Sequence, residues 1–98
     1  MKGQYLKLTW VEPGVGIRFL VAKVIIGKGP TPKRVVYPER EDPCTESGFA
    51  LYVAGRGNEL RLRAPTESKR RMRRFLRDYI RRQGGSTWSV NFWRTPWR

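Results

Sequence analysis

Residues 66–83, TESKRRMRRFLRDYIRRQ, carry the clearest structural pattern in this 98-residue chain. The apolar side chains of this stretch recur at helical spacing: Met72, Phe75, Leu76, Tyr79 and Ile80. Such spacing is typical of the buried stripe of an amphipathic helix. Thr66 is the expected N-cap, Glu67 the expected acid of the first turn, and Gly84-Gly85 the expected stop. We therefore predict one helix over Thr66–Gln83.

Short segments of alternating polarity on both sides of this helix predict strands. The expected strands are Tyr5–Val11, Ile17–Ile26, Lys33–Tyr37, Phe49–Ala54, Glu59–Arg63 and Thr87–Trp93. Strands joined by short turns favour antiparallel pairing. The predicted fold is therefore α+β: an antiparallel sheet of five to six strands with one amphipathic basic helix packed on one face, all within a single domain over residues 1–98. Ile17–Ile26 is apolar on both faces, so we expect a central strand covered on both sides or paired across a dimer.

Composition narrows the function. Lys plus Arg number 21 against 8 acids, which gives a net charge of +13 and favours a polyanionic partner. The absence of His removes the usual general base and zinc ligand. Cys44 is the single cysteine and is expected to be a loop thiol. We expect no enzyme activity, no cofactor and no metal, although Glu39, Glu41 and Asp42 leave a metal-dependent nuclease as a minor alternative.

Basic side chains dominate the other side of the predicted helix. Between residues 66 and 83, eight Lys and Arg residues oppose two acids. At about 100° per residue, five of them cluster within roughly 100° opposite the apolar stripe: Arg70, Arg73, Arg74, Arg77 and Arg81. Like charges at this spacing destabilise a helix, so we interpret the cluster as an anion-binding face. A solvated face and a localisation signal are the alternatives.

Aromatic residues are the second indication of nucleic-acid binding. The candidates for base stacking are Trp10, Tyr52, Trp88, Trp93 and Trp97, with Tyr5 and Tyr37 as weaker ones; Arg61 and Arg63 join the helix arginines as candidate phosphate contacts. Trp93 and Trp97 stand beside Arg94 and Arg98, an arrangement suited to a stacking platform. Trp97 could instead pack on the sheet or on a second subunit. The expected core aromatics are Phe19, Phe49, Phe75, Tyr79 and one of Trp10 or Trp88.

The sheet segments, the arginine-rich helix and the closing segment Trp88-Ser89-Val90-Asn91-Phe92-Trp93 give an architecture that resembles the ThermoDBP-related single-stranded-DNA-binding proteins of hyperthermophilic archaea. The resemblance covers the whole chain and rests on no diagnostic motif. It implies that bases enter an apolar cleft flanked by basic residues. The scarcity of Asn and Gln, two of each, agrees with a thermophilic source.

These observations predict a non-enzymatic protein that binds single-stranded nucleic acid, DNA before RNA, with little sequence preference. The alternatives are a duplex-DNA chromatin protein and an RNA-binding or ribonucleoprotein subunit. The N-terminal residues lack the apolar region of a signal peptide, and no apolar run is long enough to span a membrane. We therefore expect a cytoplasmic, nucleoid-associated protein with no membrane partner, and a homodimer as its assembly state.

Overall fold

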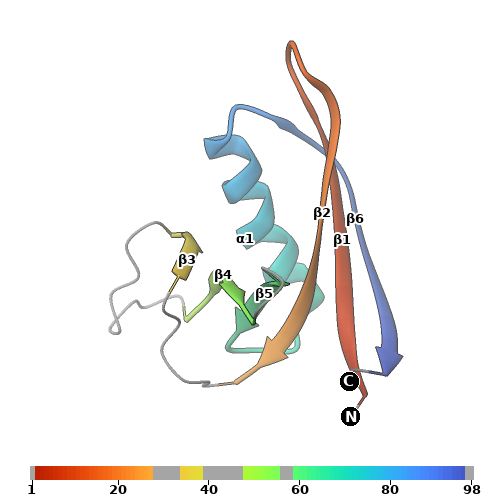
Figure 1. Cartoon of the computed structure of the whole chain (residues 1–98), viewed down its shortest axis with the longest axis vertical. Helices are drawn as coiled ribbons and strands as arrows, with labels where there is room; N and C mark the ends of the chain where they lie inside the picture. The colour runs from red at the N-terminus through yellow and green to blue at the C-terminus, as the bar shows by residue number, and fades with distance from the viewer. Residues whose placement is uncertain (1, 28–33, 39–47, 56–58, 97–98) are drawn as a thin grey trace.

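Figure 1 shows a computed structural model that describes residues 2–27, 34–38, 48–55 and 59–96, without the side chains of 2–3 and 87–96. Cys44, Trp97 and the acids at 39, 41 and 42 lie outside the described residues. The elements are β1 Lys2–Glu12, β2 Gly16–Ile26, β3 Arg34–Tyr37, β4 Ala50–Ala54, β5 Glu59–Ala64, α1 Lys69–Arg82 and β6 Ser86–Pro96. They form a six-stranded sheet in the order β3-β4-β5-β2-β1-β6, with α1 against one face (Figure 1). The predicted α+β class is confirmed.

The topology follows from how the chain leaves the first hairpin. β1 and β2 pair antiparallel, and the chain then crosses to the far edge of the sheet, where β3, β4 and β5 return as an antiparallel meander. The meander brings β5 beside β2 in the same direction, so this pair is parallel. The prediction of antiparallel pairing is wrong at this one junction. Parallel pairing needs a long connection, and β3 and β4 provide one between β2 and β5. The short turns seen in the sequence indicate only the antiparallel neighbours.

The core lies between α1 and the face of the sheet that it covers. Alternate residues of β1, Leu6, Leu8 and Trp10, are buried there, as are Leu51 and Leu62 of the meander. The helix contributes Met72, Leu76 and Ile80, each with no exposed surface. Burying a side chain of this size stabilises a fold by about 1.5–3 kcal/mol. The apolar stripe predicted from the sequence is therefore the surface that fixes α1 to the sheet.

The helix begins two residues later than the predicted N-cap. Ser68 is the N-cap, and its hydroxyl accepts a hydrogen bond from the Arg71 amide at 3.3 Å. Thr66 instead accepts a hydrogen bond from the Ser68 amide at 3.2 Å, so it forms the turn that precedes the cap. Glu67 consequently lies outside the first turn, which holds no acid. Serine is a better N-cap than threonine, which agrees with the observed start of the helix.

The helix ends at the glycine pair, as predicted. Gly84 adopts a φ of 80°, and its amide donates to the Arg81 carbonyl at 3.1 Å. The Gly85 amide donates to the Ile80 carbonyl at 3.1 Å, which completes a Schellman motif. A Cβ on Gly85 would lie 2.5 Å from Cδ1 of Trp10, so only glycine allows the chain to pass this close to the indole.

The second face of β2 is not covered by the described part of the chain itself, which rules out the first of the two predicted alternatives, while pairing across a dimer stays a prediction. Ile17 and Phe19 are each 64% exposed and Val21 is 41% exposed, so this central strand is covered on one side only within the described structure. The reason is that one helix covers one face of a sheet. The same observation removes Phe19 from the predicted core, whereas Phe49 and Trp10 are buried and Phe75 and Tyr79 pack against the core. In the described part of the chain, no helix has the length and apolar character needed to cross a membrane.

Candidate nucleic-acid interface

The face of the sheet that α1 leaves uncovered carries aromatic, aliphatic and basic side chains. We call it the open face. The strands β1, β2, β4 and β5 contribute to it the residues that alternate with the buried ones. Its described members include Tyr5, Lys7, Thr9, Val11, Ile17, Phe19, Val21, Lys23, Ile25, Tyr52, Glu59, Arg61 and Arg63.

One row of the open face crosses the sheet in continuous register. Tyr5 on β1 pairs with Lys23 on β2, Lys23 with Arg61 on β5, and Arg61 with Tyr52 on β4. Directly paired residues project from the same side of a sheet, and their Cβ atoms lie about 4.5–5.5 Å apart. Two aromatic rings therefore flank two cations in a line perpendicular to the strands. The register also places Trp93 of β6 opposite Tyr5, at the end of this row.

A single carboxylate holds the two cations of the row. Glu59 lies 3.4 Å from Nζ of Lys23 and 3.2 Å from a guanidinium nitrogen of Arg61. The hydrogen bond from Arg61 and then the contact with Lys23 lower the pKa of Glu59 below its usual value. The side chains of Lys23 and Arg61 are 14% and 32% exposed, so the carboxylate fixes both cations close to the surface of the sheet.

Phe19 is the most exposed aromatic side chain in the described part of the chain. Its ring is covered on one side by the ammonium group of Lys7, which lies 5.0 Å from the ring centroid. A similar contact joins Lys23 and Tyr5 at 5.9 Å. Each aromatic ring thus has a cation beside it, and the outer surface of Phe19, which is 64% exposed, can accept a second flat group.

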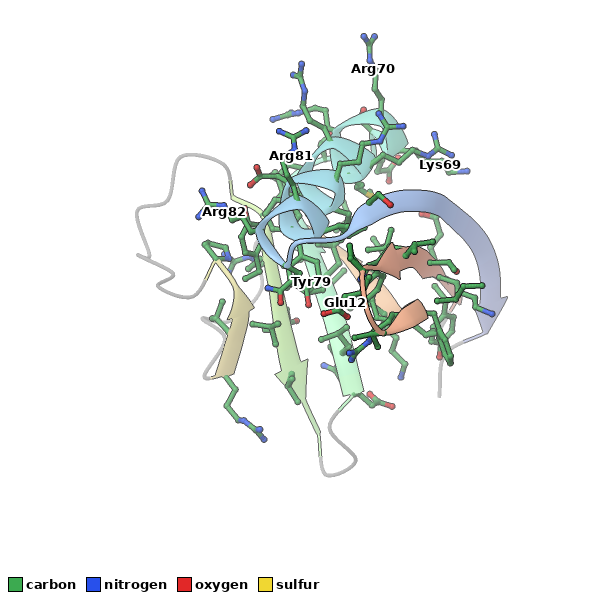
Figure 2. The ribbon with its side chains drawn as sticks, turned by 90° about the horizontal axis from the view of Figure 1, so that it is seen from above. Glu12, Lys69, Arg70, Tyr79, Arg81 and Arg82 are labelled. Atoms are coloured by element: carbon green, nitrogen blue, oxygen red, sulfur yellow. The ribbon has the colours of Figure 1, made fainter. Side chains whose placement is uncertain are left out.

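The helix arginines form a different surface, on the opposite side of the molecule. Arg70, Arg74, Arg77 and Arg81 are exposed and follow one line along α1; we call these four residues the arginine strip. In Figure 2, Arg70 and Arg81 point away from the sheet, while Tyr79 points towards Glu12 of the hairpin. The strip is about 16 Å long, since eleven residues separate its ends at 1.5 Å each. Within the described structure, no carboxylate forms an ion pair with it.

Basic residues on the flanks of the helix have partners. Arg71 lies over the ring of Phe49 at 5.9 Å, and Arg82 lies over the ring of Tyr37 at 5.6 Å. Arg82 also forms an ion pair with Asp78 at 3.5 Å, and the Tyr37 hydroxyl donates a hydrogen bond to the same carboxylate. Burial first, and then this hydrogen bond, raise the pKa of Tyr37. The one acid of α1 is therefore engaged away from the strip.

The residues predicted to form one binding surface are divided between two. Arg61, Arg63 and Tyr52 lie on the open face, and the Arg63 Nε donates to the Gly48 carbonyl at 3.4 Å. The helix group, Arg70, Arg73, Arg74, Arg77 and Arg81, is exposed on the other side. The two groups do not lie on one surface, because the sheet separates them. A helix that buries its apolar stripe against a sheet must direct the opposite side away from it.

The predicted aromatic residues have different outcomes. Trp10 is 6% exposed and packs under α1, so its ring is not available for stacking and we remove it from the set. Tyr37, a weaker candidate, is also buried. Trp88 and Trp93 belong to β6, and their side chains are not among those described; Trp88 stands at the register shift where Thr9 pairs with Ser89 and Trp10 with Thr87. Trp97 is outside the described residues.

Sequence reasoning missed three contributors to the open face: Lys7, Phe19 and Lys23. The sequence predicts Phe19 in the core, because the strand that holds it is apolar on both faces. The sequence does contain an indication that Phe19 is exposed. Leu20, Ala22 and Val24 lie on one side of the strand and Phe19 on the other, and a single predicted helix can cover only one of these two sides. Lys7 and Lys23 alternate with the same core residues and follow from the same reasoning.

Comparison of the chain with protein-family models, curated proteins and solved structures gives no match. The resemblance to ThermoDBP-related proteins therefore stays a prediction. The function has to be argued from the two surfaces described above.

Proposed function

We propose that this protein binds single-stranded nucleic acid, DNA before RNA, across the open face of its sheet, and that it does so without catalysing a reaction. The observation that carries the proposal is the row Tyr5, Lys23, Arg61 and Tyr52, in which two aromatic rings flank two cations across four neighbouring strands. Bases stack on the rings, and phosphates contact the cations. Both contacts are common to all bases, so little sequence preference is expected.

Phe19 supplies the most accessible stacking surface. A base placed on its outer side would form a sandwich with the ring and the ammonium group of Lys7. Stacking of this kind contributes about 1–3 kcal/mol per base. An unpaired strand can present its bases to such a surface, whereas a duplex keeps them stacked inside the helix. This difference is why the open face favours a single strand over a duplex.

The hairpin end of the open face supports a second candidate function, contact with another copy of the chain. Besides Phe19, it exposes Val11, Val15, Ile17 and Val21, at 39–64% each. Clustered exposed apolar side chains mark interaction surfaces in general, and a second copy would cover them without any base stacking. Base stacking uses the ring of Phe19 and not the side chain of Ile17, whereas a dimer contact uses both. One pair of variants therefore distinguishes the two functions.

Phe19→Ala and Ile17→Ala form a matched pair, because both side chains are 64% exposed on the same face of the same strand. Binding of a labelled oligo(dT) is measured by fluorescence anisotropy. If bases stack on Phe19, its truncation weakens binding by roughly 5- to 150-fold, the equivalent of about 1–3 kcal/mol, and Ile17→Ala has little effect. Equal small effects on oligonucleotide binding, together with equal loss of self-association in sedimentation, would instead identify the dimer contact.

Competition decides between the types of nucleic acid. Unlabelled single-stranded DNA, single-stranded RNA and duplex DNA of equal length are used to displace the labelled oligo(dT) at fixed salt. The proposal requires the duplex to be the weakest competitor. Preferential displacement by duplex DNA would favour a chromatin protein, and preferential displacement by RNA would favour a ribonucleoprotein subunit.

A further inference from the structure

The arginine strip takes no part in the binding just proposed, because the sheet and the core separate it from the open face. We propose that the strip is a second nucleic-acid contact, that it binds the phosphate backbone without stacking, and that the protein thereby bridges two nucleic-acid segments. The bridging rests on the proposed function of the open face, while the strip as a contact stands on its own observations.

Charge is the first observation. Arg70, Arg74, Arg77 and Arg81 repeat at intervals of four, three and four residues, so their neighbouring Cα atoms are about 4.5–6 Å apart along the helix axis. Like charges three and four residues apart destabilise a helix. Within the described structure, no carboxylate forms an ion pair with these four arginines, and the direct partners of Asp78 are Arg82 and Tyr37. A line of positive charge without paired carboxylates is complementary to a polymer with regularly spaced negative charge.

The chemistry of the strip identifies the part of the ligand that it contacts. Guanidinium groups bind phosphate oxygens in a bidentate manner. The described aromatic side chains of the helix, Phe75 and Tyr79, pack towards the core, so the strip has no ring on which a base could stack. The strip therefore contacts the sugar-phosphate backbone alone. Because duplex and single strand share this backbone, it is expected to bind both, unlike the open face.

The placement of the two surfaces allows one copy of the protein to bridge two nucleic-acid segments. Arg70 and Arg81, the two ends of the strip, point away from the sheet (Figure 2), and the open face is the face of the sheet that α1 does not cover. A short oligonucleotide that occupies one surface leaves the other available. Two separate segments can therefore be held by one copy of the protein, one through stacking and phosphate contacts, the other through phosphate contacts only.

The test uses the full-length protein, a biotinylated oligo(dT) on beads and, in solution, a fluorescent oligo(dT) or a fluorescent duplex. Wild-type protein is expected to retain both fluorescent probes on the beads at low salt. The variant with Arg70, Arg74, Arg77 and Arg81 all changed to Gln is expected to bind the immobilised strand but to retain at least tenfold less of either probe. Its salt slope for duplex binding should decrease by about 3–4, since each lost phosphate contact removes about 0.9.

Two double variants provide a charge-matched control. Arg74→Gln with Arg77→Gln removes two charges from the strip, and Arg71→Gln with Arg82→Gln removes two from the partnered flanks of the same helix. Only the first is expected to reduce bridging. Circular dichroism and thermal unfolding confirm that each variant is folded. Equal effects of the two pairs would show that net charge, rather than the strip, controls the interaction, and would overturn the inference.

The remaining outcomes separate the two proposals. If the strip variant bridges as well as the wild type, two open faces in a dimer hold the two segments and the inference is wrong, while the open-face proposal stands. If Phe19→Ala changes nothing and the strip variant loses all binding, the strip stands as a nucleic-acid contact, and both the open-face proposal and the bridging are wrong.

Discussion

Glu59 is the one described carboxylate on the open face, and it lies where the proposed ligand would place a phosphate. Its contacts with Lys23 and Arg61 lower its pKa, so it stays ionised at neutral pH and repels a phosphate while it holds the two cations in position. At the scale of the single residue, this carboxylate limits the proposed activity. Glu12 is a suitable comparison, because it forms an ion pair with Arg18 at 3.1 Å on the helix side of the hairpin.

Glu59→Gln is expected to tighten oligonucleotide binding. Removal of the negative charge releases Lys23 and Arg61 for phosphate contact, and the gain is on the order of fivefold in 50–100 mM salt, with a steeper salt dependence. Anisotropy titrations over a series of salt concentrations measure both effects. Glu12→Gln makes the same change in net charge away from the open face and should alter binding much less. Equal effects of the two variants would contradict the assignment of the open face.

Tyr37 is expected to make stability depend on alkaline pH. Its folded-state pKa is raised above the ordinary value of 10.0, by burial and by the hydrogen bond to Asp78, so the folded chain holds this proton more tightly than the unfolded chain. The resulting stability is present below about pH 10. It is lost as the pH rises through the folded-state pKa. Urea unfolding between pH 8 and 11 should therefore show a smaller alkaline loss for Tyr37→Phe than for wild type; parallel profiles would contradict the role of Tyr37.

At the scale of the element, α1 has two faces that serve different purposes. Met72, Leu76 and Ile80 attach it to the sheet, and the arginine strip destabilises it unless an anion is present. A helix kept for stability alone would carry acids among these arginines. The conflict between the strip and helix stability supports the proposal that the strip has a ligand.

Arg74→Glu is expected to stabilise the fold and to weaken nucleic-acid binding. The new carboxylate would replace the repulsive contacts with Arg70 and Arg77 by attractive ones, each worth about 0.2–0.5 kcal/mol, and these outweigh one new repulsion of similar size with Asp78, four residues further on. Thermal unfolding should therefore show a melting temperature a few degrees higher, while duplex affinity falls at least tenfold at low salt. Arg74→Gln should give intermediate values for both. A variant that is more stable and binds duplex DNA as tightly as wild type would show that the strip has no nucleic-acid ligand.

At the scale of the whole molecule, a net charge of +13 on 98 residues opposes the compact state. The fold separates much of this charge into two surfaces on opposite sides of the sheet, which lowers the repulsion between them. Repulsion within each surface remains. Counterions or a polyanion can reduce it, so the stability of the isolated protein is expected to depend on its ionic environment.

Added salt is expected to raise the melting temperature. The screening length decreases from about 30 Å at 0.01 M to about 10 Å at 0.1 M, which weakens repulsion along the strip and across the open face. A gain of about 1 kcal/mol would raise the melting temperature by roughly 4–8 °C in a chain of this size. Differential scanning fluorimetry between 10 and 300 mM NaCl measures the shift. The strip variant carrying four Gln residues should show a smaller increase, and an equal one would contradict the contribution of the strip.

The sequence by itself determined the features that depend on local periodicity and local composition. The apolar stripe from Met72 to Ile80 indicates the helix and its buried face, the glycine pair indicates its end, and alternation indicates the strands. The helix arginines follow in the same way, because opposite sides of a helix are fixed by its geometry. What these patterns do not contain is which strands become neighbours.

Only the tertiary structure decided that β5 lies parallel to β2, and this pairing places Lys23 beside Arg61 and creates the open-face row. It also decided that Phe19 is exposed and Trp10 buried, although both are large aromatic residues in alternating strands. The physical reason is that a strand has two faces and this helix covers one of them. Which face is covered depends on the register of all the strands together, and no single segment carries that information.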